Sequence, residues 1–134
     1  MRLLTSTRTA MAQAIITAIG NGATIKNYNG TMPTDLGAPE GTLLSTGTWT
    51  GVPIGTASAG GIDIDEAGIT QSNGSHVNGT PTFSRVSTSG GAAIIDIGIG
   101  AGADEWDFAG TVATGQNVTY TGLTIPVAAA NATA

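Results

Sequence analysis

Residues 93–99 read Ala93-Ile94-Ile95-Asp96-Ile97-Gly98-Ile99, a nearly continuous apolar run that is rich in β-branched side chains. Such side chains favour a pleated strand, and a run without polar alternation is typical of a strand that is buried on both faces. We therefore expect residues 92–99 to form a central strand of a sheet.

Shorter runs rich in threonine and β-branched residues surround this strand, separated by Gly, Pro and Asn. Gly115-Gln116 lies between the last two runs and predicts a short hairpin connection. About seven short strands predict an antiparallel β-sandwich or a barrel-like module, so the expected fold class is mainly β. The other six expected strands are 24–29, 41–50, 61–65, 80–86, 108–113 and 117–127.

The N-terminal 20 residues carry the helical pattern of the chain. Its apolar side chains recur at i, i+3, i+4, i+7 and i+8, which predicts one apolar helix face. Thr5, Ser6 and Thr7 are candidate N-caps, and Gly20 is a candidate stop. We expect one domain over 1–134, with a helix at 1–20, a sandwich at 23–127 and a tail at 128–134. The members of the apolar face are Met11, Ala14, Ile15, Ala18 and Ile19.

The composition excludes several functional classes. Glycine, threonine and alanine make up nearly half of the 134 residues, and large side chains are scarce. A net charge of −5 with four basic residues disfavours nucleic-acid binding. With no cysteine and one histidine, the chain lacks the usual residues of a zinc site or a nucleophilic triad. No stretch has the length of a membrane span. We expect no enzyme activity, no cofactor and no catalytic or metal site.

Several motifs have two interpretations. Asp63 and Asp65 share one face of an expected strand, where they either bind Ca²⁺ or act as solvated edge charges. Gly98–Ala103 matches a dinucleotide fingerprint, but the acidic residues 104–107 follow it, so we interpret it as a glycine-rich turn. His76 lies in a polar loop at 67–79 and is expected to be solvated or to make a turn contact.

Six residues are candidates for an interface with a neighbouring molecule. The helix stripe would reach an adjacent subunit, and the two tryptophans would anchor either the core or a contact. Arg85 lies within an expected strand and predicts an ion pair, either structural or between subunits. The candidates are Met11, Ile15, Ile19, Trp49, Arg85 and Trp106.

Four segments in order resemble small virion proteins of tailed bacteriophages: Thr5–Ile16, Gly47–Thr50, Gly79–Val86 and Gly115–Ile125. The resemblance implies a virion structural subunit with a helix followed by a β-sandwich. We expect a capsid decoration (cement) protein on the capsid surface, made in the host cytoplasm. Its expected partners are copies of itself, with a trimer favoured, and the major capsid protein. The alternative is a tail or fibre module that binds host carbohydrate through an exposed Trp49 or Trp106.

Overall fold

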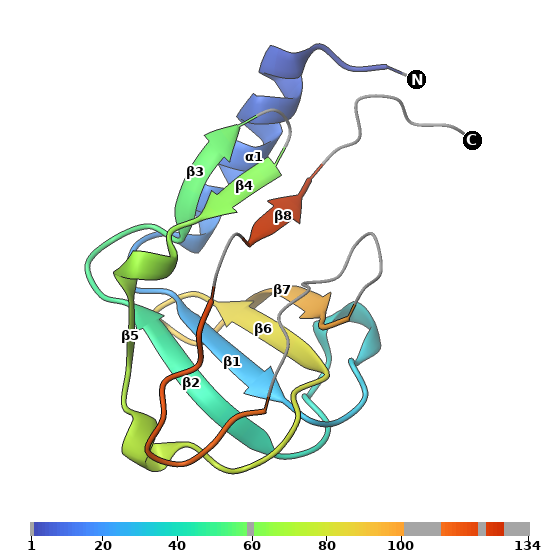
Figure 1. Ribbon diagram of the computed structural model, residues 1–134. Coiled ribbons are helices and arrows are strands. Elements are labelled where there is room, and N and C mark those ends of the chain that lie inside the picture. Colours follow the sequence, from blue (N-terminus) through green and yellow to red (C-terminus); the bar gives the residue numbers. More distant parts are fainter. Residues whose placement is uncertain (1, 59–60, 101–110, 121–122, 128–134) are drawn as a thin grey trace.

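Two antiparallel sheets and one N-terminal helix make up the computed structural model, which describes residues 2–58, 61–100, 111–120 and 123–127 (Figure 1). The mainly β, sandwich-like prediction is confirmed, and neither sheet closes into a barrel. The larger sheet has the order β5-β2-β1-β6-β7 and the smaller one the order β3-β4-β8. The strands are β1 Thr24–Tyr28, β2 Leu43–Trp49, β3 Gly55–Ser58, β4 Gly61–Ile64, β5 Ile69–Gln71, β6 Phe83–Ser87, β7 Ala93–Gly98 and β8 Thr124–Pro126.

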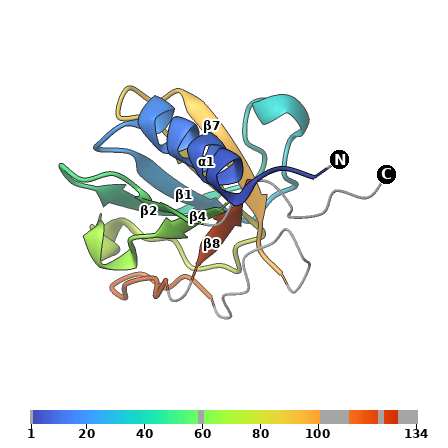
Figure 2. The same ribbon diagram turned by 90° about the horizontal axis from the view of Figure 1, so that it is seen from above.

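Helix α1 spans Thr5–Ile19 and lies against β3 and β4 (Figures 1 and 2). Its end is as predicted: Gly20 has a φ of 74°, a left-handed conformation that glycine adopts without strain, and its N–H donates to the Ile16 carbonyl at 3.0 Å. Its start is not as predicted. The N-cap is Leu4, and no side chain caps the helix.

Strand β7 corrects the expectation of a central strand. It lies at the edge of the five-stranded sheet, and its residues are half-buried except for Ile97. Ile95 and Ile97 pair with Val86 and Ser84 of β6. Asp96 lies between them in the chain, so the alternation of a strand directs it to the opposite face. The apolar run therefore belongs to an edge strand, on which Ile97 is buried on one face and the side chain of Asp96 on the other.

The short strands β3 and β5 were not expected from the sequence. Conversely, the expected strand at 117–127 is confirmed only for Thr124–Pro126, because residues 117–120 form no strand and 121–122 lie outside the described residues. Gly115 does form a turn, with a φ of 83°. Of the expected strand at 108–113, residues 108–110 lie outside the described part, and Val112 makes an isolated bridge to Gly79.

The C-terminal residues 112–127 connect the two sheets. Val112 bridges to Gly79, and the backbone of Val118 bonds to both amide atoms of the Gln71 side chain at 2.8 Å. Farther along, the carbonyl of Leu123 accepts from the Ile64 N–H at 3.1 Å, and Ile125 pairs with Ile62 in β4. This one segment therefore contacts the large sheet first and completes the small sheet afterwards.

A single apolar core runs between α1 and the two sheets. Isoleucine is its commonest large residue, and Trp49 is its largest fully buried side chain. The chain thus builds a core of its own despite its composition. The buried members are Ala12, Ile16, Ile19, Ala23, Ile25, Trp49, Ile54, Ile62, Ile64, Val86, Ile97, Tyr120, Leu123 and Ile125.

Asn27 is a fully buried amide in the middle of the large sheet. Its Nδ2 donates to Ser45 Oγ at 2.8 Å and to the Tyr120 hydroxyl at 2.6 Å, and its Oδ1 accepts from Ser84. Ser45 lies on β2, Ser84 on β6 and Tyr120 on the C-terminal segment. The amide therefore joins three adjacent strands to the segment that crosses them, and it is fully satisfied.

Replacing Asn27 with alanine removes this junction and leaves three buried hydroxyls short of a partner. We expect Asn27→Ala to lower the free energy of unfolding by about 3 kcal/mol, because unsatisfied buried polar groups are costly. Urea denaturation measures the change. Asn21→Ala, at an exposed asparagine, is the control and should stay within about 0.5 kcal/mol of the parent. Equal effects of the two substitutions would contradict the structural role of Asn27.

The pKa of Tyr120 is raised, because burial penalises the phenolate more than the hydrogen bonds with Asn27 and Ser45 favour it. A pKa that is higher in the folded chain than in the unfolded chain stabilises the fold below the unfolded value of about 10. This contribution is lost as the pH rises through the folded pKa. We expect the urea midpoint to fall as the pH rises above about 10, and to fall less in Tyr120→Phe. An identical fall in both proteins would show that Tyr120 does not cause it.

Candidate functional site

The apolar face of α1 is wider than the part of it that the rest of the chain buries. Ile16 and Ile19 pack into the core, whereas Met11 is 42% exposed and Ile15 is half-buried. The predicted stripe of Met11, Ile15 and Ile19 is therefore divided, because Ile19 belongs to the core. The adjacent residues Ile15 and Ile16 explain the difference. The apolar side chains of α1 can be assigned to either of two overlapping helix faces, and only the contacts with the rest of the fold decide which face is buried.

The uncovered part of this face carries exposed apolar side chains, with the exposed Thr7 among them. Leu4 is 74% exposed, and Met11, Ala14 and Ala18 are exposed too. Their spacing of i, i+7, i+10 and i+14 places all four on one side of the helix. We call these four residues the outer face of α1. It is an apolar surface on the part of the molecule that projects from the large sheet (Figure 1).

Of the two expected tryptophan anchors, Trp49 serves the core. Its indole Nε1–H donates to the Asp65 carbonyl at 3.0 Å, so its polar end is satisfied inside the chain. An exposed Trp49, on which the carbohydrate-binding alternative partly depends, is therefore excluded. Trp106 lies outside the described residues, as do the acidic residues 104–107 and the end of the glycine-rich motif.

Arg85 makes the predicted ion pair within the chain. Its Nε and Nη2 donate to the two carboxylate oxygens of Asp96, both at 2.7 Å, and Nη2 also donates to the Gly37 carbonyl at 2.7 Å. Both side chains are more than nine-tenths buried. The hydrogen bond to Asp96 raises the pKa of Arg85, so the guanidinium keeps its charge.

The rings of Tyr28 and Phe83 stack with centroids 5.2 Å apart.

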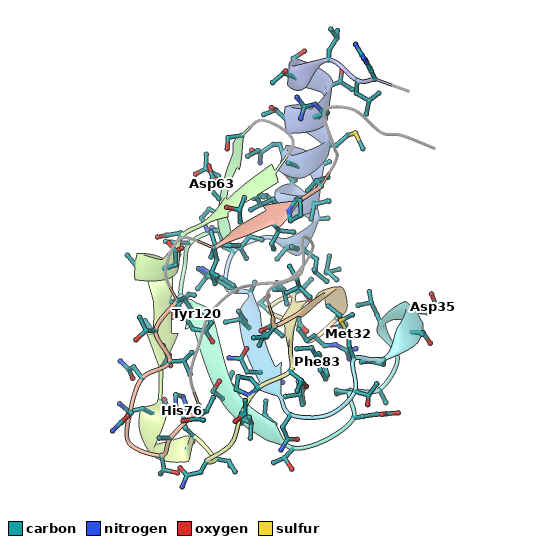
Figure 3. The ribbon with its side chains drawn as sticks, turned by 45° about the vertical axis from the view of Figure 1, so that its right-hand side comes forward. Met32, Asp35, Asp63, His76, Phe83 and Tyr120 are labelled. Atoms are coloured by element: carbon teal, nitrogen blue, oxygen red, sulfur yellow. The ribbon has the colours of Figure 1, made fainter. Side chains whose placement is uncertain are left out.

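The acidic pair Asp63 and Asp65 is occupied by local hydrogen bonds. Asp63 accepts from the Ser58 hydroxyl at 2.6 Å, and Asp65 accepts from the Gly68 N–H at 3.1 Å. Within the described residues, no three His, Cys, Asp or Glu side chains come together as a metal site. Among the described residues, a Ca²⁺ ion at Asp63 and Asp65 would therefore find no third carboxylate ligand. Figure 3 shows Asp63 in the upper part of the molecule and His76 in the lower part, well apart from each other.

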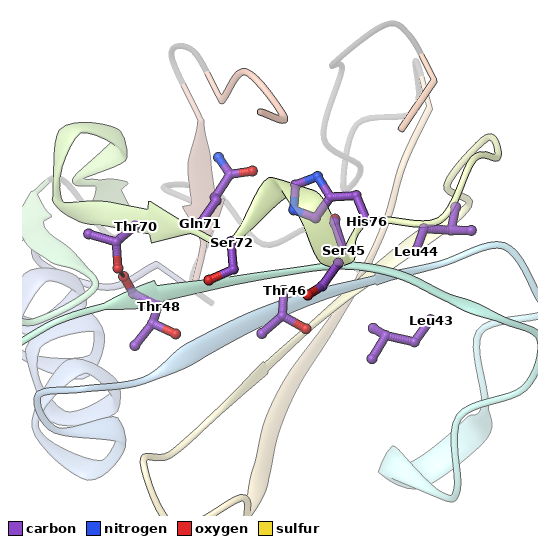
Figure 4. Close-up of a pocket in the computed structure, with 10 residues that line it drawn as sticks. Leu43, Leu44, Ser45, Thr46, Thr48, Thr70, Gln71, Ser72 and His76 are labelled. Carbon is purple, nitrogen blue, oxygen red and sulfur yellow. Dashed lines mark hydrogen bonds between the residues drawn. The ribbon is translucent and has the colours of Figure 1, made fainter. Parts of the chain in front are cut away.

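Of the two expectations for His76, solvation is wrong, and a contact with a turn, the one at Thr114–Gln116, is confirmed. His76 is only 3% exposed, and its Nδ1 lies 3.0 Å from the carbonyl oxygen of Gln116. It lines a pocket of about 420 Å³ together with residues of β2 and β5 (Figure 4). No local pattern in the sequence predicts this burial, because Gln116 is 40 residues away along the chain.

No protein-family model matches the chain, and comparisons with curated proteins and with solved structures find no match either. Among the described residues, no helix has the length and apolar character needed to cross a lipid bilayer.

Breaking the buried pair from one side should be costly. We expect Arg85→Met to lower the free energy of unfolding by about 3–5 kcal/mol, because Asp96 is left buried without its cation. The double variant Arg85→Met with Asp96→Leu should recover much of that loss. Chemical denaturation over a range of protein concentrations is the measurement, with the exposed Arg2→Met as the neutral control. A loss that appears only at concentrations where the protein self-associates would instead place Arg85 in a contact between subunits.

Proposed function

We propose that this chain is a non-enzymatic structural protein of a bacteriophage particle, a decoration (cement) protein that oligomerises on the capsid and stabilises it. The observation that carries the proposal is the outer face of α1, in a chain whose segments resemble phage virion proteins. An exposed apolar strip on a projecting helix is a surface suited to contact with another protein.

The geometry of the outer face suits self-association. Ala14 and Ala18 are small, so a neighbouring backbone can approach α1 closely, and Leu4 and Met11 provide the larger apolar contacts. Burying each of these two side chains against a partner contributes about 1–2 kcal/mol. Because the same strip is present on every copy, a closed symmetric oligomer buries it several times over. A trimer is the state we favour, with the major capsid protein as the second partner.

The described ionisable groups support a structural role. The buried charges of Arg85 and Asp96 neutralise each other, and Asp65 caps a turn. Catalysis by general acid and base needs such groups to converge on a substrate with their proton-transfer atoms free. Here Arg85, Asp96 and Asp65 are used to hold two strands and a turn together.

Charged substitutions on the outer face test the association. We expect Met11→Glu and Ala18→Glu each to weaken self-association at least about tenfold, because a carboxylate is costly to bury in an apolar contact. Gln13→Glu adds the same charge at an exposed position on the opposite side of α1 and should have no effect. Sedimentation velocity measures association, and circular dichroism checks that α1 persists. A wild-type chain that stays monomeric at high concentration would contradict the proposal.

Location in the particle is tested separately. Mass spectrometry of purified virions should detect the chain, and particles that lack it should bind the recombinant protein with a fixed number of copies per capsid. Absence of the chain from virions would overturn the proposal, as would turnover of a defined substrate. Recovery with isolated tails and not with capsids would favour the tail or fibre alternative.

A further inference from the structure

Four asparagines of the chain are each followed directly by a glycine. Because glycine has no side chain, its backbone nitrogen can approach the side chain of the preceding asparagine closely. Attack of that nitrogen on the asparagine Cγ is the first step of spontaneous deamidation, and it needs a free N–H and room for the backbone to move. The four pairs are Asn21-Gly22, Asn29-Gly30, Asn73-Gly74 and Asn78-Gly79.

Two of the pairs are protected because a carbonyl holds the glycine N–H. The Gly22 N–H donates to the Trp49 carbonyl at 3.1 Å, and the Gly79 N–H donates to the Val112 carbonyl at 3.0 Å. A backbone nitrogen in such a bond can react only after the local structure has opened. The reaction at these two pairs therefore carries the additional cost of that opening.

The pair Asn29-Gly30 is protected by packing. The Asn29 Oδ1 accepts from the Thr42 N–H at 2.7 Å, and the Asn29 N–H donates to the Thr42 carbonyl at 3.3 Å. Gly30 lies so close to the backbone of Glu40 that a Cβ at this position would clash with it. The movement that brings the Gly30 nitrogen to the Asn29 Cγ is therefore obstructed.

Within the described residues, the pair Asn73-Gly74 has none of these restraints. Gly74 is exposed, and beyond its chain neighbours no atom lies within 4 Å of the position that a Cβ would take. It lies in the short helix Asn73–Ser75, whose first N–H groups have no partner inside the helix, and the side chain of Ser72 does not cap them. The Asn73 amide donates to one exposed side chain, the Asn117 Oδ1, at 3.0 Å.

We infer that Asn73 is a site of spontaneous modification in the folded protein, where its amide is converted to aspartate and isoaspartate. The Gly74 nitrogen loses its proton to a solvent base and forms a bond to the Asn73 Cγ. The Cγ–Nδ2 bond breaks, and Nδ2 takes a proton from water and leaves as ammonia. Water then opens the resulting succinimide. Opening at Cγ gives aspartate, and opening at the former backbone carbonyl gives isoaspartate, in which the chain runs through the side chain.

Isoaspartate at this position loosens the turn beside His76. The Asn73 carbonyl accepts from the His76 N–H at 3.1 Å and from the Gly115 N–H at 2.9 Å, so it joins the turn to the C-terminal segment. In isoaspartate this carbonyl becomes a carboxylate beside the chain, and the backbone gains a methylene group. The modification therefore weakens the attachment of the C-terminal segment to the large sheet. This inference rests on the turn alone and is independent of the proposed virion role.

The rate at each site tests the inference. The full chain is incubated in mildly alkaline buffer, and peptide mass spectrometry with electron-transfer fragmentation locates aspartate and isoaspartate over time. We expect Asn73 to be modified at least about tenfold faster than each of Asn21, Asn29 and Asn78, because those three sites must open first. In urea the four sites should react at similar rates, because no structure then protects any of them.

Two variants separate the chemistry from its consequence. Gly74→Ala places its methyl group in open space, so the fold is kept, but the methyl hinders the attacking nitrogen. It should slow the modification of Asn73 at least about tenfold. Asn73→Asp carries the new charge without the lengthened backbone and should keep the urea midpoint of the fresh parent. The midpoint of the aged parent should instead fall as its isoaspartate content rises.

Three results would overturn the inference. The first is that another of the four asparagines reacts as fast as Asn73 in the folded chain. The second is that Asn73 reacts fastest by the same margin in urea, because the fold then plays no part in the selection. The third is that isoaspartate forms at Asn73 without any fall in the urea midpoint.

Discussion

The hydrogen bonds of one buried amide hold the large sheet in its register and attach the C-terminal segment to it. Asn27 lies opposite Ser45 on one side and Ser84 on the other, so a shift of either neighbouring strand by one residue would direct the serine hydroxyl away from the amide. The same Nδ2 bonds to Tyr120, 93 positions along the chain. A buried polar group is costly unless it is satisfied, which makes this arrangement specific as well as stabilising.

This network also changes the meaning of the composition. A chain with so few large side chains suggests that neighbouring molecules must supply the missing core. The structure shows an internal core built on isoleucine and Trp49, extended by serine and asparagine side chains that are buried and hydrogen-bonded. Among the described residues, exposed large apolar side chains remain on the outer face of α1, at Leu4 and Met11, and also at Met32, Leu36, Leu43 and Val77. The chain therefore does not depend on neighbours for its core, and its open apolar surface is divided among several places.

Local patterns in the sequence predicted the helix, its end at Gly20 and the strands with clear β-branched runs, because those features depend on neighbouring residues. Local patterns failed wherever distant partners decide the outcome. The rotation of α1 depends on which side of Ile15-Ile16 meets β3 and β4, and the edge position of β7 depends on the order of strands in the large sheet. Strand β5 has only three residues and exists through its pairing with β2. His76 and Asn27 gave no signal, because Gln116 and Tyr120 lie far along the chain.

The segment from Val112 to Pro126 crosses the large sheet and then becomes the outer strand of the small one. During synthesis the N-terminal strands emerge first, but neither Asn27 nor β4 can acquire its final partner until these last residues have left the ribosome. Contacts of such long sequence separation are slow to form, since the loop between them must close first. The native fold therefore cannot be completed before residues 112–126 have been synthesised.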